Sequence, residues 1–71
     1  MKVTIEQTEK LLKGDQSFSQ LGFALMLTRL RTLYVKQPSE STLKSCMGEI
    51  NMYLEKYPVI MNADYAIIAK M

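Results

Sequence analysis

The stretch LGFALMLTRLRTLYVK, residues 21–36, decides the fold because its apolar residues occupy two sides of one helix. With about 100° between successive residues, one apolar sector has the width of an ordinary core face. This sector contains Phe23, Met26, Leu27, Leu30, Leu33 and Tyr34. Other apolar residues project away from it, on the flank that two threonines share: Phe18, Leu21, Leu25 and Val35. A helix over about 17–36 therefore needs cover on a second side.

A short helix is predicted before this stretch. It begins at Thr4, with Gln7 at the return position of a capping box, and Gly14 ends it in a left-handed conformation. Its apolar face contains Ile5, Thr8, Leu11 and Leu12. Ser17 and Gln20 are expected to form a second capping box at the start of the long helix. A helix of about ten residues is unstable alone, so the first helix must dock on the rest of the chain.

The segment after Pro38 is the clearest amphipathic helix in the chain. Ser39 or Ser41 is expected to cap it, and it covers about 40–57. Its apolar face contains Leu43, Cys46, Met47, Ile50, Tyr53, Leu54 and Tyr57. Because the connection to the preceding helix is short, the two helices are predicted to be antiparallel neighbours in a helical hairpin.

The last stretch, VIMNADYAIIAKM at 59–71, is apolar on nearly every side, with Asp64 and Lys70 as its charged residues. A helix here is expected to start either at Pro58 or later, with Asn62 as the cap. We expect the segment to bury against the hairpin or against another molecule, since a solvated tail of this composition would expose too much apolar surface.

These elements predict an all-α fold in a single domain over 1–71. It comprises an antiparallel helical hairpin (about 17–36 and 40–57), a short N-terminal helix and an apolar C-terminal helical segment. A domain of 71 residues has a thin core and commonly needs a disulfide, a metal or association with another chain. Cys46 is the one cysteine and the chain has no histidine, so association is the support we expect.

The composition predicts no enzymatic activity. The commonest general base is absent, and no glycine-rich phosphate loop or nucleophile-elbow serine is present. Glu6 and Glu9 share a solvent-facing side of the first helix, which is typical of a solvated charged surface. We therefore expect no cofactor, no metal and no small-molecule substrate. The start lacks the apolar core of a signal peptide and no apolar run approaches about 20 residues, which predicts no membrane span and a cytoplasmic location.

The surplus apolar surface leaves two interpretations open. Either a four-helix arrangement buries it internally, or it binds a protein partner or a second copy. Small residues at Ser41, Ser45 and Gly48, followed by Met52, suggest a further approach surface on the helix over 40–57, or else a weakly polar solvent face. The residues expected to contact a partner are Phe18, Leu21, Leu25, Val35, Ser45, Gly48, Met52, Ile67 and Ile68.

The alternative function is a small helix-turn-helix-like DNA-binding regulator that reads DNA through the helix over 40–57. KQPSESTLKSC at 36–46 resembles the turn and start of a recognition helix. Lys44 and Asn51 are its obvious base-reading candidates, and the formal net charge is +2. The two arginines of the preceding helix diverge by about 160°, so they make no common basic stripe. These features disfavour nucleic acid as the partner.

The order of helices also carries a family resemblance. IEQTEKLLKGD at 5–15 precedes LGFALMLTRLRTL at 21–33, then a proline-marked turn and a second long helix. This layout resembles the small helical-hairpin co-chaperones of type III secretion systems, which help to hold the needle subunit before export. The resemblance covers about 5–57. It implies a short helix followed by an antiparallel pair, gripped by a larger helical-repeat chaperone.

Overall fold

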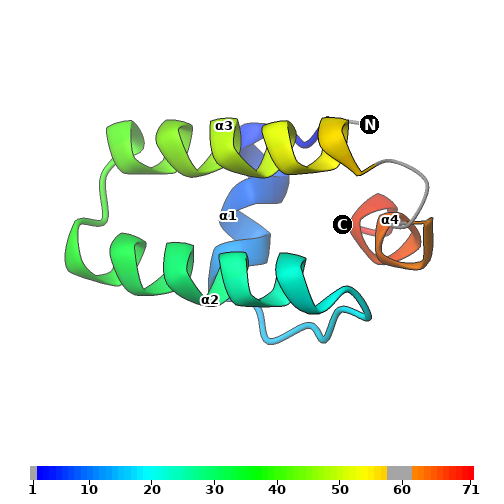
Figure 1. Cartoon of the computed structure of the whole chain (residues 1–71). Helices are drawn as coiled ribbons and strands as arrows, with labels where there is room; N and C mark the ends of the chain where they lie inside the picture. Colours follow the sequence, from blue (N-terminus) through cyan, green and yellow to red (C-terminus); the bar gives the residue numbers. More distant parts are fainter. Residues whose placement is uncertain (1, 58–61) are drawn as a thin grey trace.

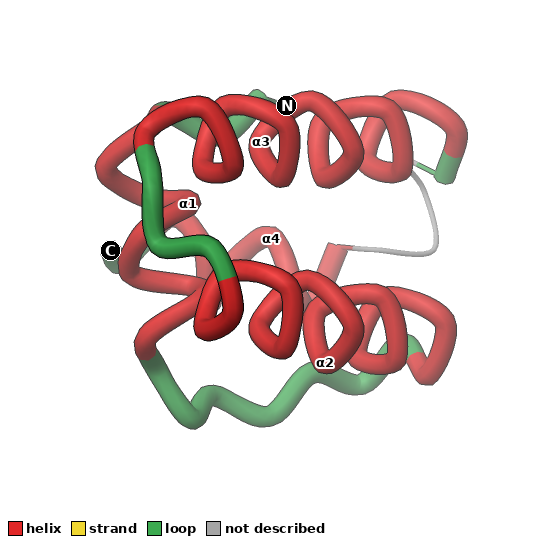
Figure 2. Tube along the Cα trace, turned by 90° about the vertical axis from the view of Figure 1, so that its left-hand side faces the viewer, coloured by secondary structure: helices red, strands yellow, loops and turns green. Residues whose placement is uncertain are grey.

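Every regular element that the structure describes is an α-helix. The computed structural model describes residues 2–57 and 62–71 (Figure 1). The helices are α1 (Ile5–Lys13), α2 (Leu21–Lys36), α3 (Glu40–Lys56) and α4 (Asn62–Ala69). The predicted all-α class is confirmed. α2 and α3 lie side by side and run in opposite directions, an arrangement compatible with the predicted hairpin (Figures 1 and 2).

α1 joins the two long helices into one core. It crosses one side of the α2–α3 pair and packs against both helices (Figure 2). Its buried face consists of Thr8, Leu11 and Leu12. The buried residues of the long helices are Phe23, Leu27, Leu30, Thr42, Leu43, Cys46, Ile50 and Leu54. The apolar faces expected from helical spacing therefore meet inside the molecule, with one exception, since Leu33 is 40% exposed.

The two ends of α1 are fixed by different means. At its start, the predicted capping box is present: the Gln7 amide donates to Thr4 Oγ1 at 3.1 Å and the Thr4 amide donates to Gln7 Oε1 at 3.0 Å. The predicted left-handed Gly14 is wrong, because this residue is extended, with φ −86° and ψ 174°. Instead the Arg31 guanidinium of α2 donates to the Leu11 carbonyl oxygen at 3.0 and 3.1 Å. A cation at the carbonyl end of a helix also complements its dipole.

The start of α2 differs from the prediction. The helix begins at Leu21, and Gln20 occupies the capping position without a side-chain hydrogen bond, so the expected box with Ser17 does not form. A buried carboxylate of α4 instead fixes the two residues that precede the helix. Asp64 accepts hydrogen bonds from the Ser19 amide (2.8 Å), the Ser19 hydroxyl (2.9 Å) and the Gln20 amide (3.1 Å). The helix start is therefore set by a contact between distant segments.

α4 closes the open end of the hairpin, opposite the turn between α2 and α3 (Figure 1). Its described part covers Asn62–Ala69, so Asn62 is helical instead of lying before the helix, while the other predicted start, Pro58, lies outside the described residues. The Tyr65 hydroxyl donates to the Leu54 carbonyl oxygen of α3 at 2.9 Å. Ile68 is fully buried. Through these contacts and the carboxylate at the start of α2, α4 ties together the N-terminal end of one long helix and the C-terminal end of the other.

The two helical glycines give a matched pair of variants. A Cβ added at Gly48 meets no atom within 4 Å, so Gly48→Ala is expected to raise the free energy of unfolding by about 0.5–1 kcal/mol. At Gly22 the added Cβ would lie 2.5 Å from the Tyr53 hydroxyl, whose ring packs on Phe23 and Tyr57. Gly22→Ala should therefore raise the free energy of unfolding by less than Gly48→Ala does, or lower it. Urea unfolding of both variants tests this, and a larger gain at Gly22 would contradict it.

Candidate functional site

The residues expected to contact a partner separate into three groups. Three lie on the exposed side of α2: Leu21 is 70% exposed, Leu25 61% and Val35 79%. Three lie on the exposed side of α3: Ser45, Gly48 and Met52. The remaining three, Phe18, Ile67 and Ile68, are half-buried or buried. The fold therefore does not bring all nine to one surface.

The third group belongs to the interior or its edge. Phe18 is half-buried, and its ring lies edge-on against the Phe23 ring with centroids 5.0 Å apart. Ile68 is 0% exposed and Ile67 is half-buried. The physical reason is that α4 packs at the open end of the hairpin, where its apolar residues complete the core. Phe18 and Ile68 are therefore assigned to internal packing instead of to a partner surface.

The exposed side of α2 is apolar along the length of the helix. The Thr28 hydroxyl donates to the Ala24 carbonyl oxygen at 3.0 Å, and the Thr32 hydroxyl donates to the Thr28 carbonyl oxygen at 3.1 Å. These bonds satisfy both hydroxyl donors within the helix, so the threonines add little polarity to the surface. We call this surface the α2 outer face, and it consists of Leu21, Leu25, Thr28, Thr32 and Val35. Sequence reasoning placed both threonines on this flank but missed that their hydroxyls turn inward.

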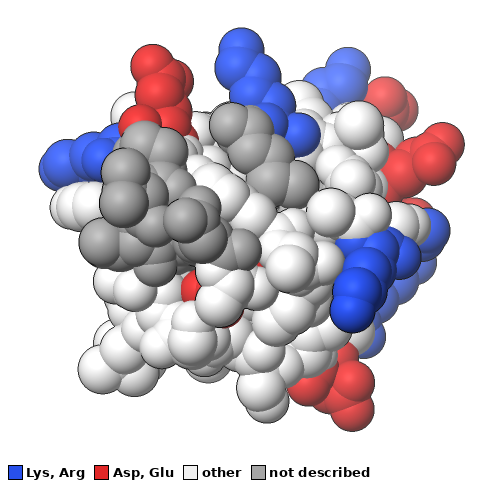
Figure 3. All heavy atoms as spheres, turned by 90° about the vertical axis from the view of Figure 1, so that its right-hand side faces the viewer, with Lys and Arg blue, Asp and Glu red and all other residues white. Residues whose placement is uncertain are grey.

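The end of the molecule where α2 begins is also poor in charge. Figure 3 shows this end, with α4 toward the viewer, and the charged side chains lie mostly around its periphery. White residues fill the lower left and most of the described part of the centre, with a few red atoms visible between them.

The α3 candidates lie beside a shallow depression. It has a volume of about 260 Å³ and lies between α2 and α3. Its lining is Met26, Arg29, Glu49, Met52, Tyr53 and Lys56. An ion pair crosses from one helix to the other there, with 2.8 Å between Arg29 Nη2 and Glu49 Oε2. Met52, at 72% exposed, therefore lies outside the α2 outer face but shares this depression with Arg29 of α2.

Side chains required by the DNA-binding alternative are already engaged within the chain. Asn51 Oδ1 accepts from the Val3 amide at 2.7 Å, and Asn51 Nδ2 donates to the Val3 carbonyl oxygen at 3.4 Å. Lys44 Nζ lies 3.6 Å from Glu40 Oε1. A base-reading helix needs its amide and basic side chains directed into the groove. No contact on α3 favours this alternative.

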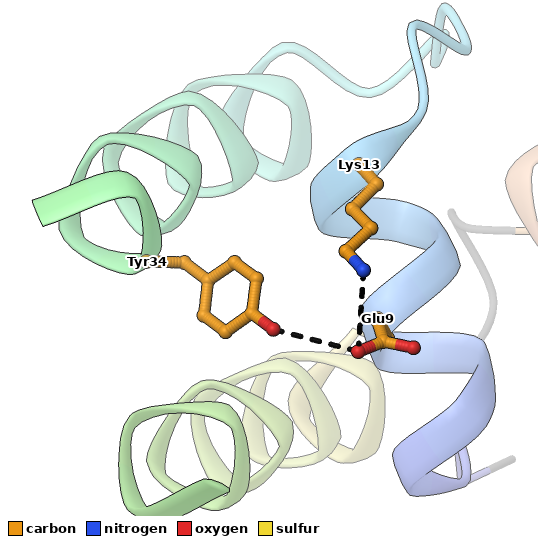
Figure 4. Close-up of polar contacts among 3 residues, drawn as sticks. All are labelled: Glu9, Lys13 and Tyr34. Atoms are coloured by element: carbon orange, nitrogen blue, oxygen red, sulfur yellow. Dashed lines mark hydrogen bonds and ion pairs between the residues drawn. The ribbon is translucent and has the colours of Figure 1, made fainter. Parts of the chain in front are cut away.

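Glu9, one of the two carboxylates on α1 noted in the sequence, has a structural role. The Tyr34 hydroxyl of α2 donates to Glu9 Oε2 at 3.4 Å, and Lys13 Nζ lies 3.5 Å from the same oxygen (Figure 4). Figure 4 shows Tyr34 pointing from α2 toward α1, so the carboxylate links the two helices. The Glu9 side chain remains 44% exposed, at the edge of the α1–α2 contact.

The single thiol is also structural. Cys46 is 1% exposed. Burial raises the pKa of the Cys46 thiol, nearby Glu49 raises it further, and Arg29 opposes the shift. A thiol with a raised pKa is protonated at neutral pH and is a poor nucleophile. Within the described residues, no group of three or more metal-ligating side chains comes together.

Leu21, Leu25 and Val35 thus make the α2 outer face an exposed apolar surface. Among the helices in the described ranges, none has both the length and the apolar character needed to cross a membrane. Comparisons of the chain with protein-family models, with curated proteins and with solved structures find no match.

Proposed function

We propose that this protein is a non-enzymatic interaction module that binds a protein partner through the α2 outer face. The observation that carries the proposal is the exposure of Leu21, Leu25 and Val35, at 61–79%, on one sector of a helix whose opposite side forms the core. Each large apolar side chain left in water forgoes roughly 1.5–3 kcal/mol of burial. Three such residues are a large cost against the few kcal/mol that stabilise a small domain.

The internal alternative, in which the chain's own helices cover this flank, receives less support. α1 packs on the other side of α2, and α4 lies at the end of the hairpin (Figures 1 and 2). The partner is a different protein or a second copy of the chain. A co-chaperone role, as the resemblance to the type III secretion proteins implies, is the specific form of this proposal. In that form a larger helical chaperone covers the hairpin in the cytoplasm.

The proposal is tested by changing Leu21 and Leu25 together to aspartate. Burying two leucines contributes roughly 3–6 kcal/mol to a complex, so affinity for the partner should fall by about two orders of magnitude or more. Because both side chains are exposed in the free protein, the far-ultraviolet circular dichroism and the unfolding midpoint should change little. The measurement is recovery of the partner from the native cell on immobilised wild-type and variant protein, followed by titration of the purified pair.

Ser45→Asp is the matched control, since Ser45 is exposed on α3 and does not line the depression that contains Arg29. It should bind the partner as wild type does. Equal loss of binding in the control and in the double variant would contradict a role specific to the α2 outer face. Loss of helicity in the double variant would show that Leu21 and Leu25 support the fold itself. Sedimentation at several concentrations then distinguishes a second copy from a different protein.

A further inference from the structure

The charged residues of α2 itself all have the same sign, and Glu49 of α3 pairs with one of them, Arg29. α2 contains Arg29, Arg31 and Lys36 and no aspartate or glutamate. At about 100° per residue, the α2 outer face spans a sector of roughly 80°. Arg29 and Lys36, which are seven residues apart, lie together along one border of this sector, and Arg31 lies along the other. The apolar sector is thus bordered by basic residues on both sides.

These basic residues differ in how many of their donors are already engaged in hydrogen bonds or ion pairs within the chain. Arg31 is half-buried and holds the Leu11 carbonyl oxygen through two nitrogens. Arg29 is exposed and contacts Glu49 through one nitrogen, Nη2. A guanidinium has five N–H donors, so this contact leaves donors for a second carboxylate. Lys36 is exposed and makes no hydrogen bond or ion pair within residues 2–57 and 62–71. The border formed by Arg29 and Lys36 is therefore the one that a docked molecule meets.

A second copy of the chain fits this border poorly. If two α2 helices pair face to face in antiparallel orientation, the symmetry sets the border of Arg29 and Lys36 against the same border of the other copy. In parallel orientation, the same border meets the Arg31 border. In neither case does α2 supply an opposite charge, and like charges across a contact are unfavourable.

From this charge pattern we propose that the partner presents an amphipathic helix whose apolar stripe lies on the α2 outer face and whose acidic residues lie beside Arg29 and Lys36. The inference rests on the proposed function and names the chemistry of the partner. An exposed apolar helical face is matched by another apolar helical stripe at the usual separation of packed helices. Two carboxylates about two turns apart on the partner helix match the seven-residue spacing of Arg29 and Lys36.

The test uses two synthetic helical peptides of 16 residues, the length of α2. Both carry leucines at alternating three- and four-residue spacing. One has glutamates seven residues apart along one side of the leucine stripe, and the other has lysines at the same positions. Fluorescence anisotropy titrations with the full chain at low salt should show about tenfold tighter binding of the glutamate peptide. Raising the salt concentration should reduce this preference.

Charge-reversal variants test whether Lys36 causes this preference. Lys36→Glu should remove most of the preference for the glutamate peptide. Lys44→Glu changes an exposed lysine of α3 and should leave the preference unchanged.

The two peptides could bind equally, and the double variant Leu21→Asp with Leu25→Asp could abolish both interactions. That result would contradict an acidic partner but would still support the α2 outer face as the docking surface. If neither peptide binds, the proposal of an acidic partner is also contradicted. Recovery of the partner from the native cell would then test whether the α2 outer face is the docking surface. If the wild-type chain forms a dimer and the same double variant dissociates it, the partner is a second copy of the chain, and the proposal of an acidic partner is contradicted.

Discussion

Asp64→Ala is expected to lower the free energy of unfolding by about 2–4 kcal/mol, a large fraction of the stability of a domain this small. The carboxylate is fully buried and accepts three hydrogen bonds at the start of α2, at 2.8–3.1 Å. Removing it leaves the Ser19 and Gln20 amides without that acceptor at a helix start that has no side-chain cap of its own.

The measurement for this variant is urea unfolding followed by circular dichroism at the helix band. Asp15→Ala is the matched control, because Asp15 is exposed and precedes the same helix. Its effect should stay within about 0.5 kcal/mol. If Asp64→Ala lost no more stability than Asp15→Ala, the contact between α4 and the start of α2 would not contribute to the stability of the fold.

Phe23→Ala is expected to cost about 3–5 kcal/mol, the range for a large aromatic residue removed from a packed core. Phe23 is 0% exposed and lies between two aromatic neighbours, with its ring centroid 5.0 Å from that of Phe18 and 5.7 Å from that of Tyr53. In so small a domain the cavity has few neighbours that can collapse into it. The variant should be substantially unfolded at physiological temperature.

Thermal unfolding of Phe23→Ala beside Leu33→Ala tests this assignment. Both residues belong to the apolar sector predicted from spacing, but Leu33 is 40% exposed and should cost about 1 kcal/mol or less. Equal losses of stability in the two variants would contradict the assignment of Phe23 to the core and of Leu33 to its exposed edge. A wild-type unfolding midpoint for Phe23→Ala would contradict this assignment more strongly.

The helices and their buried faces were predictable because both depend on spacing within one segment. Thr4 and Gln7 form their capping box from residues three apart, and the Ser39 side chain accepts from the Thr42 amide in the same local way. Asp64 at the start of α2 was not predictable, since its partners lie 44 and 45 residues away along the chain. Its isolation within an apolar segment was the one available signal of a buried polar contact.

The candidate surface was predictable in part for the same reason. Leu21, Leu25 and Val35 fall outside the core sector of their own helix, and the structure leaves them exposed. Phe18 and Ile68 looked equally surplus, but Phe18 packs edge-on against Phe23 and the burial of Ile68 depends on where α4 packs. That position follows from contacts between segments, which helical spacing within one segment does not encode.

Photocrosslinking from the α2 outer face in the native cell reports directly whether this face contacts a partner. A benzophenone amino acid replaces Val35, which is 79% exposed on α2, or Ser45, which is exposed on α3 away from Arg29. We expect a discrete crosslinked protein from position 35 and little or none from position 45. No adduct from position 35, or the same adduct in equal yield from both positions, would contradict it.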